Sequence, residues 1–175
     1  MSERLPKDFY YLQVAEAVAR RSTCVSKHWG AIIVRDDSII STGYNGAPRG
    51  VENCCDRGTC PRLNDPNYTR GTNYGVCTSV HAEMNAIIFA PRERMMHATL
   101  YIYGYDVPNR QLVQHPDSCP ICKRMIINAG IDQVCFADPD IGIPFTLRSL
   151  PYNARFVNVE DWVEDCECLK NTSGY

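Results

Sequence analysis

One histidine, one glutamate and two cysteines stand where a metal centre with an acid–base group beside it would need them. His81 precedes Glu83 by two residues, and Cys119-Pro-Ile-Cys122 follows further along. One histidine and two cysteines give zinc three protein ligands and leave the fourth position open, which is typical of a catalytic site. A zinc-bound water loses a proton at about pH 7, so hydroxide is available. Glu83 would move protons between this water and a substrate. The alternative is a buried histidine and an unrelated C-x-x-C site.

Two predicted helices begin at these residues. His81–Ala90 is expected to form a helix ended by Pro91, and Cys119–Ala129 a helix stopped by Gly130. The two cysteines lie one turn apart at the helix N-terminus, where the helix dipole favours thiolates, so both can reach one metal. On a regular helix His81 and Glu83 would point about 200° apart, although a first turn can direct both toward one pocket.

The remaining elements indicate an α/β fold with a mixed sheet. Apolar residues at helical spacing predict a helix, and short apolar runs predict strands. The expected elements are a helix at Lys7–Arg21, strands at Gly30–Arg35, Ser38–Thr42, Thr99–Tyr103, Gln133–Phe136 and Phe156–Val159, and a short helix at Glu160–Leu169. This order predicts three layers, with helices on both faces of about five strands.

We expect a single domain over residues 1–175. Its core would span about residues 8–137, and an extension at 138–175 would complete the sheet and add the short helix. Residues 43–80 form a long Gly-, Asn- and Cys-rich stretch between predicted elements. A loop of this length is unusual in a compact domain unless it is functional or pinned, and its cysteines are candidates for pinning it.

Composition excludes several classes of partner. The 175 residues are 45% hydrophobic and 22% charged, with a net charge of −2 and ten cysteines. A duplex nucleic acid partner is not expected, because the chain shows no basic excess. The N-terminus has no apolar signal region, and no apolar run reaches the roughly 18 residues of a membrane span. We therefore expect no membrane partner and a cytoplasmic location, where cysteine clusters more often hold metal than form disulfides.

At His81-Ala-Glu-Met-Asn-Ala-Ile87 the chain resembles the zinc-dependent cytidine and deoxycytidylate deaminase superfamily, which carries an H-x-E…C-x-x-C signature. Further stretches narrow the resemblance to deoxycytidylate deaminases of phage and bacterial type. They are Arg21–Cys24, Ser41–Pro48, Gly50–Asp56 and Ile126–Ile131. The resemblance covers about residues 8–137 and implies a cytidine-deaminase-like three-layer α/β/α fold.

The resemblance implies hydrolytic deamination of dCMP to dUMP and ammonia, which feeds thymidylate synthesis. His81, Cys119 and Cys122 would bind the catalytic Zn²⁺. Glu83 would deprotonate the zinc-bound water and then protonate the ring N3 and the leaving amine. Asn45 matches a position that contacts the sugar, while its alternative role is that of a turn residue between Tyr44 and Gly46.

A second, structural Zn²⁺ is also implied. Its four cysteines would be Cys24, one of Cys54 and Cys55, Cys60 and Cys77. Four thiolates would close a tetrahedral site and order the long stretch. The alternative is buried, unpaired thiols that pack as small apolar groups. No metal role is expected for Cys135, Cys166 and Cys168.

Phage-type and animal members of this family are hexamers, activated by dCTP and inhibited by dTTP, with Mg²⁺ accompanying the triphosphate. Gly43–Gly50 resembles a loop that carries part of the effector site. Phe89 and Arg92 fall at helix-end positions implicated in subunit contact and regulation. The alternative roles are a core aromatic residue for Phe89 and a surface charge for Arg92. The resemblance implies a homo-oligomer, with a hexamer favoured, and leaves open whether the chain is regulated.

The chain also departs from the family pattern. Ser118 stands where a proline usually precedes the first cysteine, Trp29 replaces an aliphatic residue, and residues 106–117 are longer than in the most similar deaminases. The longer segment would lie at the pocket rim. Phosphate recognition is weakly marked, and the basic residues near the pocket-forming loops are Arg21, Lys27, His28 and Arg49.

Two other functions stay open. One is deamination of another small base or nucleotide, such as cytidine, guanine or a modified pyrimidine. The other is a non-catalytic zinc protein used in assembly or DNA uptake, which Glu83 argues against because a purely structural protein has no need of it. Editing of nucleic acid has the least support, given the net charge.

Overall fold

A computed structural model of the chain describes residues 4–67, 74–139 and 152–165. Its centre is a five-stranded sheet with the strand order β2-β1-β3-β4-β5. The β3–β4 pair is parallel and the other three pairs are antiparallel, so the sheet is mixed. The strands are β1 (Lys27–Arg35), β2 (Ser38–Tyr44), β3 (Thr99–Asp106), β4 (Gln133–Asp138) and β5 (Asn153–Asn158).

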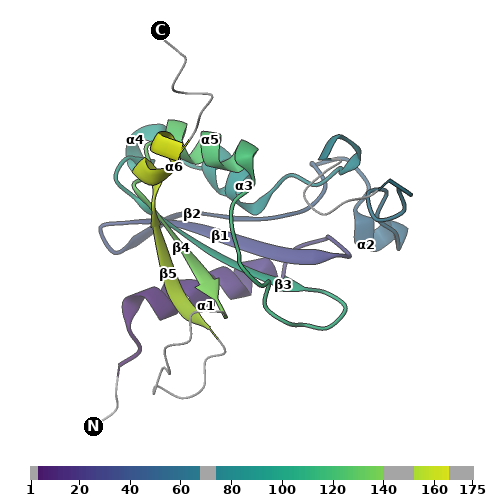
Figure 1. Ribbon diagram of the computed structural model, residues 1–175, viewed down its shortest axis with the longest axis horizontal. Helices are drawn as coiled ribbons and strands as arrows, with labels where there is room; N and C mark the ends of the chain where they lie inside the picture. Colours follow the sequence, from purple (N-terminus) through teal and green to yellow (C-terminus); the bar gives the residue numbers. More distant parts are fainter. Residues whose placement is uncertain (1–3, 68–73, 140–151, 166–175) are drawn as a thin grey trace, which may run out of the picture.

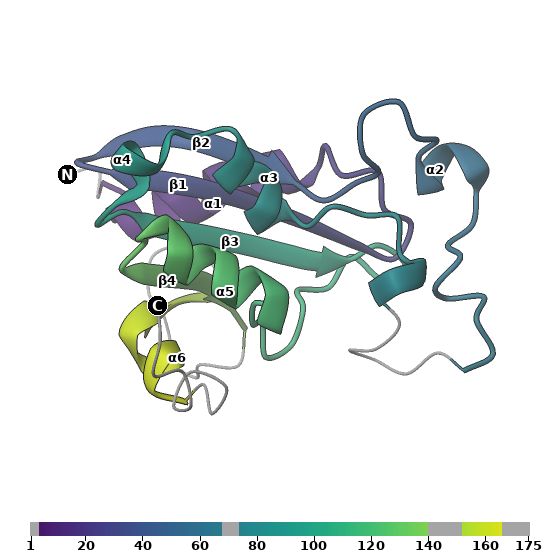
Figure 2. The same cartoon turned by 90° about the horizontal axis from the view of Figure 1, so that it is seen from above.

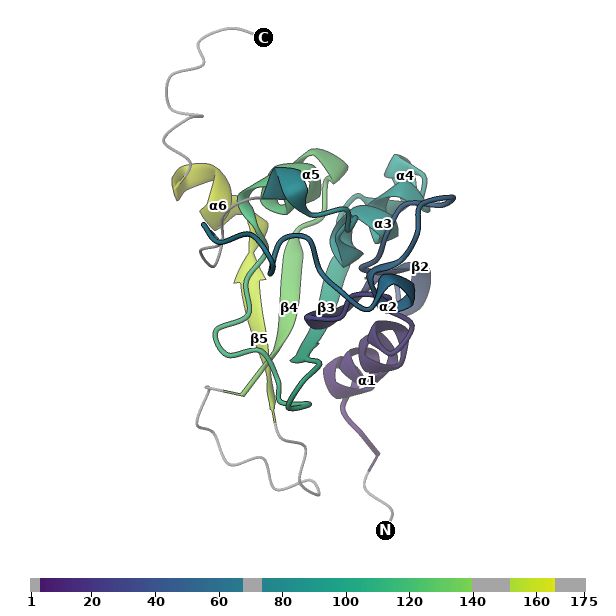
Figure 3. The same ribbon diagram turned by 90° about the vertical axis from the view of Figure 1, so that its right-hand side faces the viewer.

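Helices cover both faces of this sheet (Figures 1 and 3). One face is covered by α1 (Lys7–Ala19), and the other by α3 (Ala82–Ile88), α4 (Arg92–Met95), α5 (Pro120–Ala129) and α6 (Val159–Asp165). The predicted three-layer α/β/α architecture is therefore confirmed. Within the described residues, no helix has both the length and the apolar character needed to cross a membrane.

The core lies in two apolar layers, one on each side of the sheet. Ile33 and Ile102 belong to the layer beneath α3 and α5, whereas Ile32 and Tyr101 belong to the layer against α1. Adjacent residues alternate between the layers because successive strand side chains point to opposite faces. The central strands β1, β3 and β4 read as nearly continuous apolar runs because both of their faces are buried.

The central strands extend beyond the predicted apolar runs. Lys27 and Asp106 are register partners in the β1–β3 ladder, and their side chains form an ion pair. The ladder therefore continues through polar residues that a search for apolar runs misses. The turn between β1 and β2 consists of Asp36 and Asp37, and both residues have positive φ, as a two-residue type I′ hairpin turn requires.

Two glycines let helices approach the sheet closely. A Cβ at Gly30 would lie 2.1 Å from the Ala15 carbonyl oxygen of α1, and a Cβ at Gly43 would lie 2.3 Å from both Ala82 O and Ala86 N of α3. Only glycine leaves room for this backbone contact. Gly43 thus seats the first turn of α3, which carries Glu83, directly on β2.

The long stretch at 43–80 is pinned at its ends by backbone hydrogen bonds. Gly46 and Val80 exchange N–H···O bonds of 3.1 and 2.8 Å, just before His81. Between them lie α2 (Cys54–Arg57) and a 3₁₀ turn at Tyr74–Val76. The Cys55 N–H donates to the Thr23 carbonyl oxygen at 3.1 Å. Backbone pairing thus fixes where the stretch enters and leaves the site.

Candidate zinc and substrate site

His81, Cys119 and Cys122 converge on one point. Their ligand atoms all lie within 4.8 Å of one another. His81 Nδ1 is 3.5 Å from Cys119 Sγ and 3.4 Å from Cys122 Sγ. A tetrahedral zinc with ordinary Zn–N and Zn–S bonds has an N···S edge of about 3.5 Å. The donor set and its spacing therefore fit Zn²⁺, with a fourth position left for a small ligand.

The starts of two helices create this convergence. His81 is the N-cap residue of α3 and has extended backbone angles, φ −72° and ψ 158°. Cys119 is the N-cap residue of α5, and its sulfur accepts a bond from the Cys122 N–H. The two helices lie side by side over the sheet (Figure 2). The site is therefore held by regular structure rather than by mobile loops.

The three candidate ligands shift one another's pKa values. The Cys122 thiol, together with His81, lowers the pKa of Cys119 to about 4. The adjacent Cys119, followed by burial, raises the pKa of Cys122. The bond to Cys119 is also the main cause that raises the pKa of His81. These contacts therefore favour the thiolate form of Cys119, which is the form that binds a cation.

Glu83 lies in the first turn of α3 and is 8% exposed. Removal from water raises the pKa of its carboxyl group, as burial does for any acid. Oε1 accepts a 3.0 Å hydrogen bond from the Ser118 hydroxyl. A buried carboxyl beside a metal-ligand cluster can both take and return a proton near neutral pH.

A cavity of about 270 Å³ opens beside these groups and is lined by His81, Glu83 and Cys119. This volume is close to the lower end of the range for small-molecule sites, about 300–1,000 Å³. Other lining residues supply cationic, amide and apolar groups: Lys27, Trp29, Asn45, Arg62, Val113 and His115. The cavity can therefore hold one small polar molecule against the zinc ligands.

Residues 5–138 match the family model described as the cytidine and deoxycytidylate deaminase zinc-binding region. The chain belongs to this deaminase family. The matched span contains the three candidate ligands and Glu83, so the resemblance drawn from the motifs is confirmed at the level of the family.

Within this family, the chain is similar to several proteins named deoxycytidylate deaminase. A deoxycytidylate deaminase of Mycobacterium phage D29 is 37% identical over 134 residues, which cover 74% of this chain and 92% of that protein. The deoxycytidylate deaminase of Saccharomyces cerevisiae is 37% identical over 133 residues, but the matched segment spans only 37% of that longer protein. The crystal structure of the dCMP deaminase of cyanophage S-TIM5 is similar with a TM-score of 0.51 and 26% identity, covering 80% of this chain and 90% of that one.

Asn45, which the deaminase resemblance places at the sugar, lines the cavity and is built into the sheet. Its Oδ1 accepts from the Trp29 N–H at 2.8 Å and from the Ser22 hydroxyl at 2.6 Å. Its Nδ2 donates to the Lys27 carbonyl oxygen at 2.9 Å. An amide nitrogen carries two hydrogens, so one N–H is left for a ligand. The sugar-contacting role stays a prediction, whereas the alternative role of a turn residue is wrong: Asn45 is not among the described residues with positive φ, and it lies between β2 and the Gly46–Val80 bridge.

The cysteines of the long stretch are near the cavity but are not clustered as tightly as His81, Cys119 and Cys122. Cys24, Cys60 and Cys77 line the cavity, and Cys54 is buried. Among the described residues, no group of three potential ligands within 4.8 Å includes any of them. Cys135 lies in the core, while the positions of Cys166 and Cys168 are outside the described residues.

Of the basic residues considered for phosphate binding, Lys27 lines the cavity, whereas Arg21, His28 and Arg49 are not among its lining residues. His28 instead bonds to the Tyr105 hydroxyl and the Cys24 carbonyl oxygen. Sequence reasoning missed Arg62, a cavity cation that belongs to no recognisable motif.

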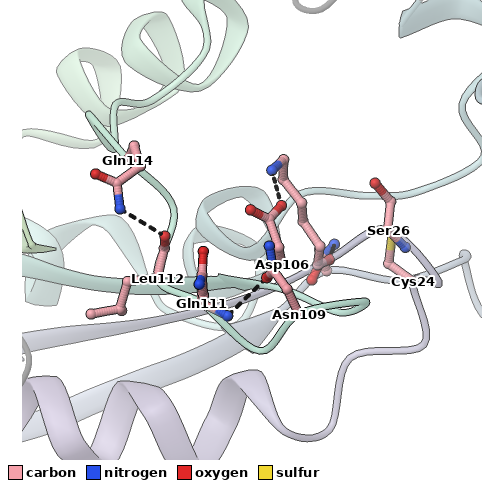
Figure 4. A network of polar contacts seen from close by, with 9 residues as sticks. Cys24, Ser26, Asp106, Asn109, Gln111, Leu112 and Gln114 are labelled. Carbon is pink, nitrogen blue, oxygen red and sulfur yellow. Dashed lines mark hydrogen bonds and ion pairs between the residues drawn. The ribbon is translucent and has the colours of Figure 1, made fainter.

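The segment at 106–118 is an ordered rim of the cavity. It turns tightly, with the Asp106 N–H donating to the Gln111 carbonyl oxygen and the Gln111 N–H donating to Asn109 Oδ1 (Figure 4). Beyond the turn, Val113 and His115 line the cavity. The predicted position at the pocket rim is therefore confirmed.

The two residues implicated in regulation differ in their surroundings. Phe89 is 55% exposed at the end of α3, and the Arg49 guanidinium lies 5.4 Å from its ring centroid. Arg92 donates from Nε to the Asn128 carbonyl oxygen at 3.0 Å, which links α4 to α5. Phe89 is therefore a surface residue rather than a core aromatic.

Proposed function

We propose that this chain catalyses the zinc-dependent hydrolytic deamination of dCMP to dUMP and ammonia. The observation that carries the proposal is the placement of buried Glu83 and the convergent ligands His81, Cys119 and Cys122 around one cavity. Family membership supports the proposal, and so does the deoxycytidylate deaminase of phage D29, because the match covers 92% of that protein.

Each residue of the site would have a distinct role in the deamination. The three ligands would hold Zn²⁺, which when bound makes water a nucleophile at neutral pH. Glu83 would accept a proton from the attacking water as the C4–O bond forms and deliver it to N3 of the pyrimidine. It would then take the proton of the new C4 hydroxyl group and deliver it to the leaving amino group. The C4–N bond breaks, a C4 carbonyl forms and ammonia leaves. The raised pKa of the Glu83 carboxyl suits both directions of transfer.

Substrate binding would use the remaining polar groups of the cavity. The spare N–H of Asn45 donates to a sugar hydroxyl, because its carbonyl oxygen already accepts two bonds. Lys27 and Arg62 bring positive charge to the lining, and a guanidinium can bind a phosphate through two parallel bonds. We assign the 5′-phosphate to Arg62, because its guanidinium lies in the cavity lining and can offer this two-bond geometry.

A second, structural zinc is proposed at Cys24, Cys54, Cys60 and Cys77. Cys60 and Cys54 are close enough to Cys24 to raise the pKa of its thiol, although burial is the larger cause. Binding would require the thiols to move closer together, since no three lie within 4.8 Å. Metal analysis of purified protein tests this directly: two equivalents support the site, and one equivalent, lost on Cys122→Ala, refutes it.

We also propose a homo-oligomer, with a hexamer favoured, regulated by dCTP and dTTP with Mg²⁺. Exposed apolar side chains near the end of α3 support an interface, since adjacent large apolar groups at a surface often mark one. Ile88 is 65% exposed and Phe89 is 55% exposed. Light scattering of the wild type and of Phe89→Ser would show assembly and its weakening, while a monomeric wild type would refute the proposal.

The testing experiment is ultraviolet-monitored deamination of dCMP, deoxycytidine, cytidine and guanine, with and without dCTP and Mg²⁺. We expect turnover of dCMP to exceed that of the other compounds. Turnover confined to another base would make the chain a deaminase of different specificity. Zinc-loaded protein that deaminates none of them would support the non-catalytic alternative. Burial of the Glu83 carboxylate argues against that alternative, because burial has a desolvation cost that a non-catalytic protein has no reason to bear.

A further inference from the structure

We infer that Ser118 is a positioning residue that fixes the Glu83 carboxyl group for proton transfer, an inference that rests on the proposed function. The Ser118 hydroxyl donates to Glu83 Oε1 at 3.0 Å. Ser118 is 3% exposed and Glu83 is 8% exposed, so water competes little for this bond. The bond joins the residue before the first cysteine of α5 to the first turn of α3.

The backbone of Ser118 is held from the α5 side. The Asp117 carboxylate accepts the Ser118 N–H on Oδ1 at 2.9 Å, and its Oδ2 pairs with Lys123 of α5 at 2.7 Å. One aspartate thus links the loop backbone to the helix that bears the two cysteine ligands.

The sheet holds the same loop from the other side. Arg155 of β5 donates to the Pro116 carbonyl oxygen and pairs with Asp138 of β4. Its Cζ atom lies 4.8 Å from the centroid of the Phe136 ring. The residues just before Ser118 are therefore attached to the last two strands. A hydroxyl on a backbone fixed this way can restrain its partner instead of following it.

The restraint matters because a glutamate carboxyl group has a soft terminal torsion. Rotation about χ3 is broad and roughly two-fold, so packing alone sets the carboxyl plane poorly. A hydrogen bond to Oε1 fixes that plane and so sets the direction in which the carboxyl group can exchange a proton. Productive proton transfer needs this geometry, and a misplacement of about 1 Å can reduce a rate by about 100-fold. A proline at this position would have no hydroxyl to supply the bond.

The first test compares Ser118→Ala, Ser118→Thr and Ser41→Ala in steady-state deamination of dCMP. Ser41 is a matched control because it is also buried, at 8% exposed, and does not line the cavity. Its hydroxyl donates at 2.6 Å to the Ala86 carbonyl oxygen of α3, the helix that carries Glu83. We expect Ser118→Ala to lower kcat by about 10- to 100-fold with KM within about twofold and zinc content unchanged. Ser118→Thr should restore most of kcat because it keeps the hydroxyl.

Two results would overturn the inference: a kcat of Ser118→Ala no lower than that of Ser41→Ala, or a Ser118→Thr variant as slow as Ser118→Ala. The second would point to packing volume instead of the hydrogen bond.

A second readout does not depend on activity. The melting temperature of the zinc-loaded full chain is measured for Ser118→Ala, Glu83→Ala and the double variant. A hydrogen bond between the two side chains makes the two shifts non-additive. Additive shifts would show that the contact does not couple them and would reject the inference. If the wild type turns over no substrate, the proposed function fails, and this cycle still decides whether Ser118 restrains Glu83.

Discussion

His81 and Glu83 line the same cavity although a regular helix would point them in opposite directions. His81 is the N-cap residue, with extended φ and ψ, and Glu83 lies in the first turn of α3. The change of backbone conformation between them turns the imidazole back toward the two cysteines while the carboxyl stays beside it. Three consecutive residues thus supply both a candidate metal ligand and a candidate proton carrier.

Replacing Glu83 with glutamine should abolish turnover without releasing zinc. Glutamine keeps the size of the side chain but cannot exchange a proton, and positioned acid–base groups contribute about 10²- to 10⁴-fold to a rate. We expect kcat for dCMP to fall by at least 10²-fold with one catalytic zinc retained, as measured by steady-state assay and metal analysis. Loss of zinc from this variant would contradict the assignment of Glu83 as a non-ligand.

Cys122→Ala should remove the catalytic zinc, whereas Cys135→Ala should not. Both thiols are fully buried, so the pair separates metal binding from packing. Cys122 Sγ is 3.4 Å from His81 Nδ1, while Cys135 lies in the layer beneath α1. We expect Cys135→Ala to lower the free energy of unfolding by about 1 kcal/mol and to keep its zinc. Equal zinc content in both variants would exclude the proposed ligand set.

Gly43→Ala should disturb the site through the backbone of α3. Its Cβ would lie 2.3 Å from both Ala82 O and Ala86 N. The strain of such overpacking is typically about 1–3 kcal/mol, and α3 must shift to relieve it. We expect a lower melting temperature and reduced zinc affinity. Gly75→Ala is the control, since no heavy atom lies within 4 Å of the added Cβ, and it should change stability by less than about 0.5 kcal/mol.

The main strands and the helices that carry the candidate metal ligands were predictable from sequence because they are encoded locally. Cys119 and Cys122 are one helical turn apart by spacing alone, and Gly130 ends that helix with the positive φ expected of it. The central strands β1, β3 and β4 were recognisable as short apolar runs because most of their side chains are buried on both faces of the sheet. His81 and the cysteines could be joined into one site only because their motifs resemble those of a known family.

Other features depend on contacts between distant segments and leave no local pattern. Arg62 reaches the cavity only because the long stretch folds back over it. Ser118 was recognisable as a departure from proline, but its bond to Glu83 requires the packing of α3 against α5. The three side-chain bonds of Asn45 likewise join β1, β2 and the end of α1.

Removing zinc should expose Cys119 as an unusually acidic thiol. Its neighbours lower its pKa to about 4, so the thiolate is present above that pH and is lost only as the pH falls through it. We therefore expect iodoacetamide to alkylate Cys119 in chelator-treated protein at nearly the same rate at pH 6 and pH 8. An ordinary thiol with a pKa of about 8.5 would react about 80-fold faster at the higher pH. The measurement is peptide mapping by mass spectrometry, with Cys55 as the internal reference. Cys55 is exposed, and its pKa is raised mainly by desolvation. Zinc-loaded protein should protect Cys119 but not Cys55. A Cys119 rate that rises with pH as steeply as that of Cys55 would show that the pair with Cys122 and His81 does not stabilise its thiolate.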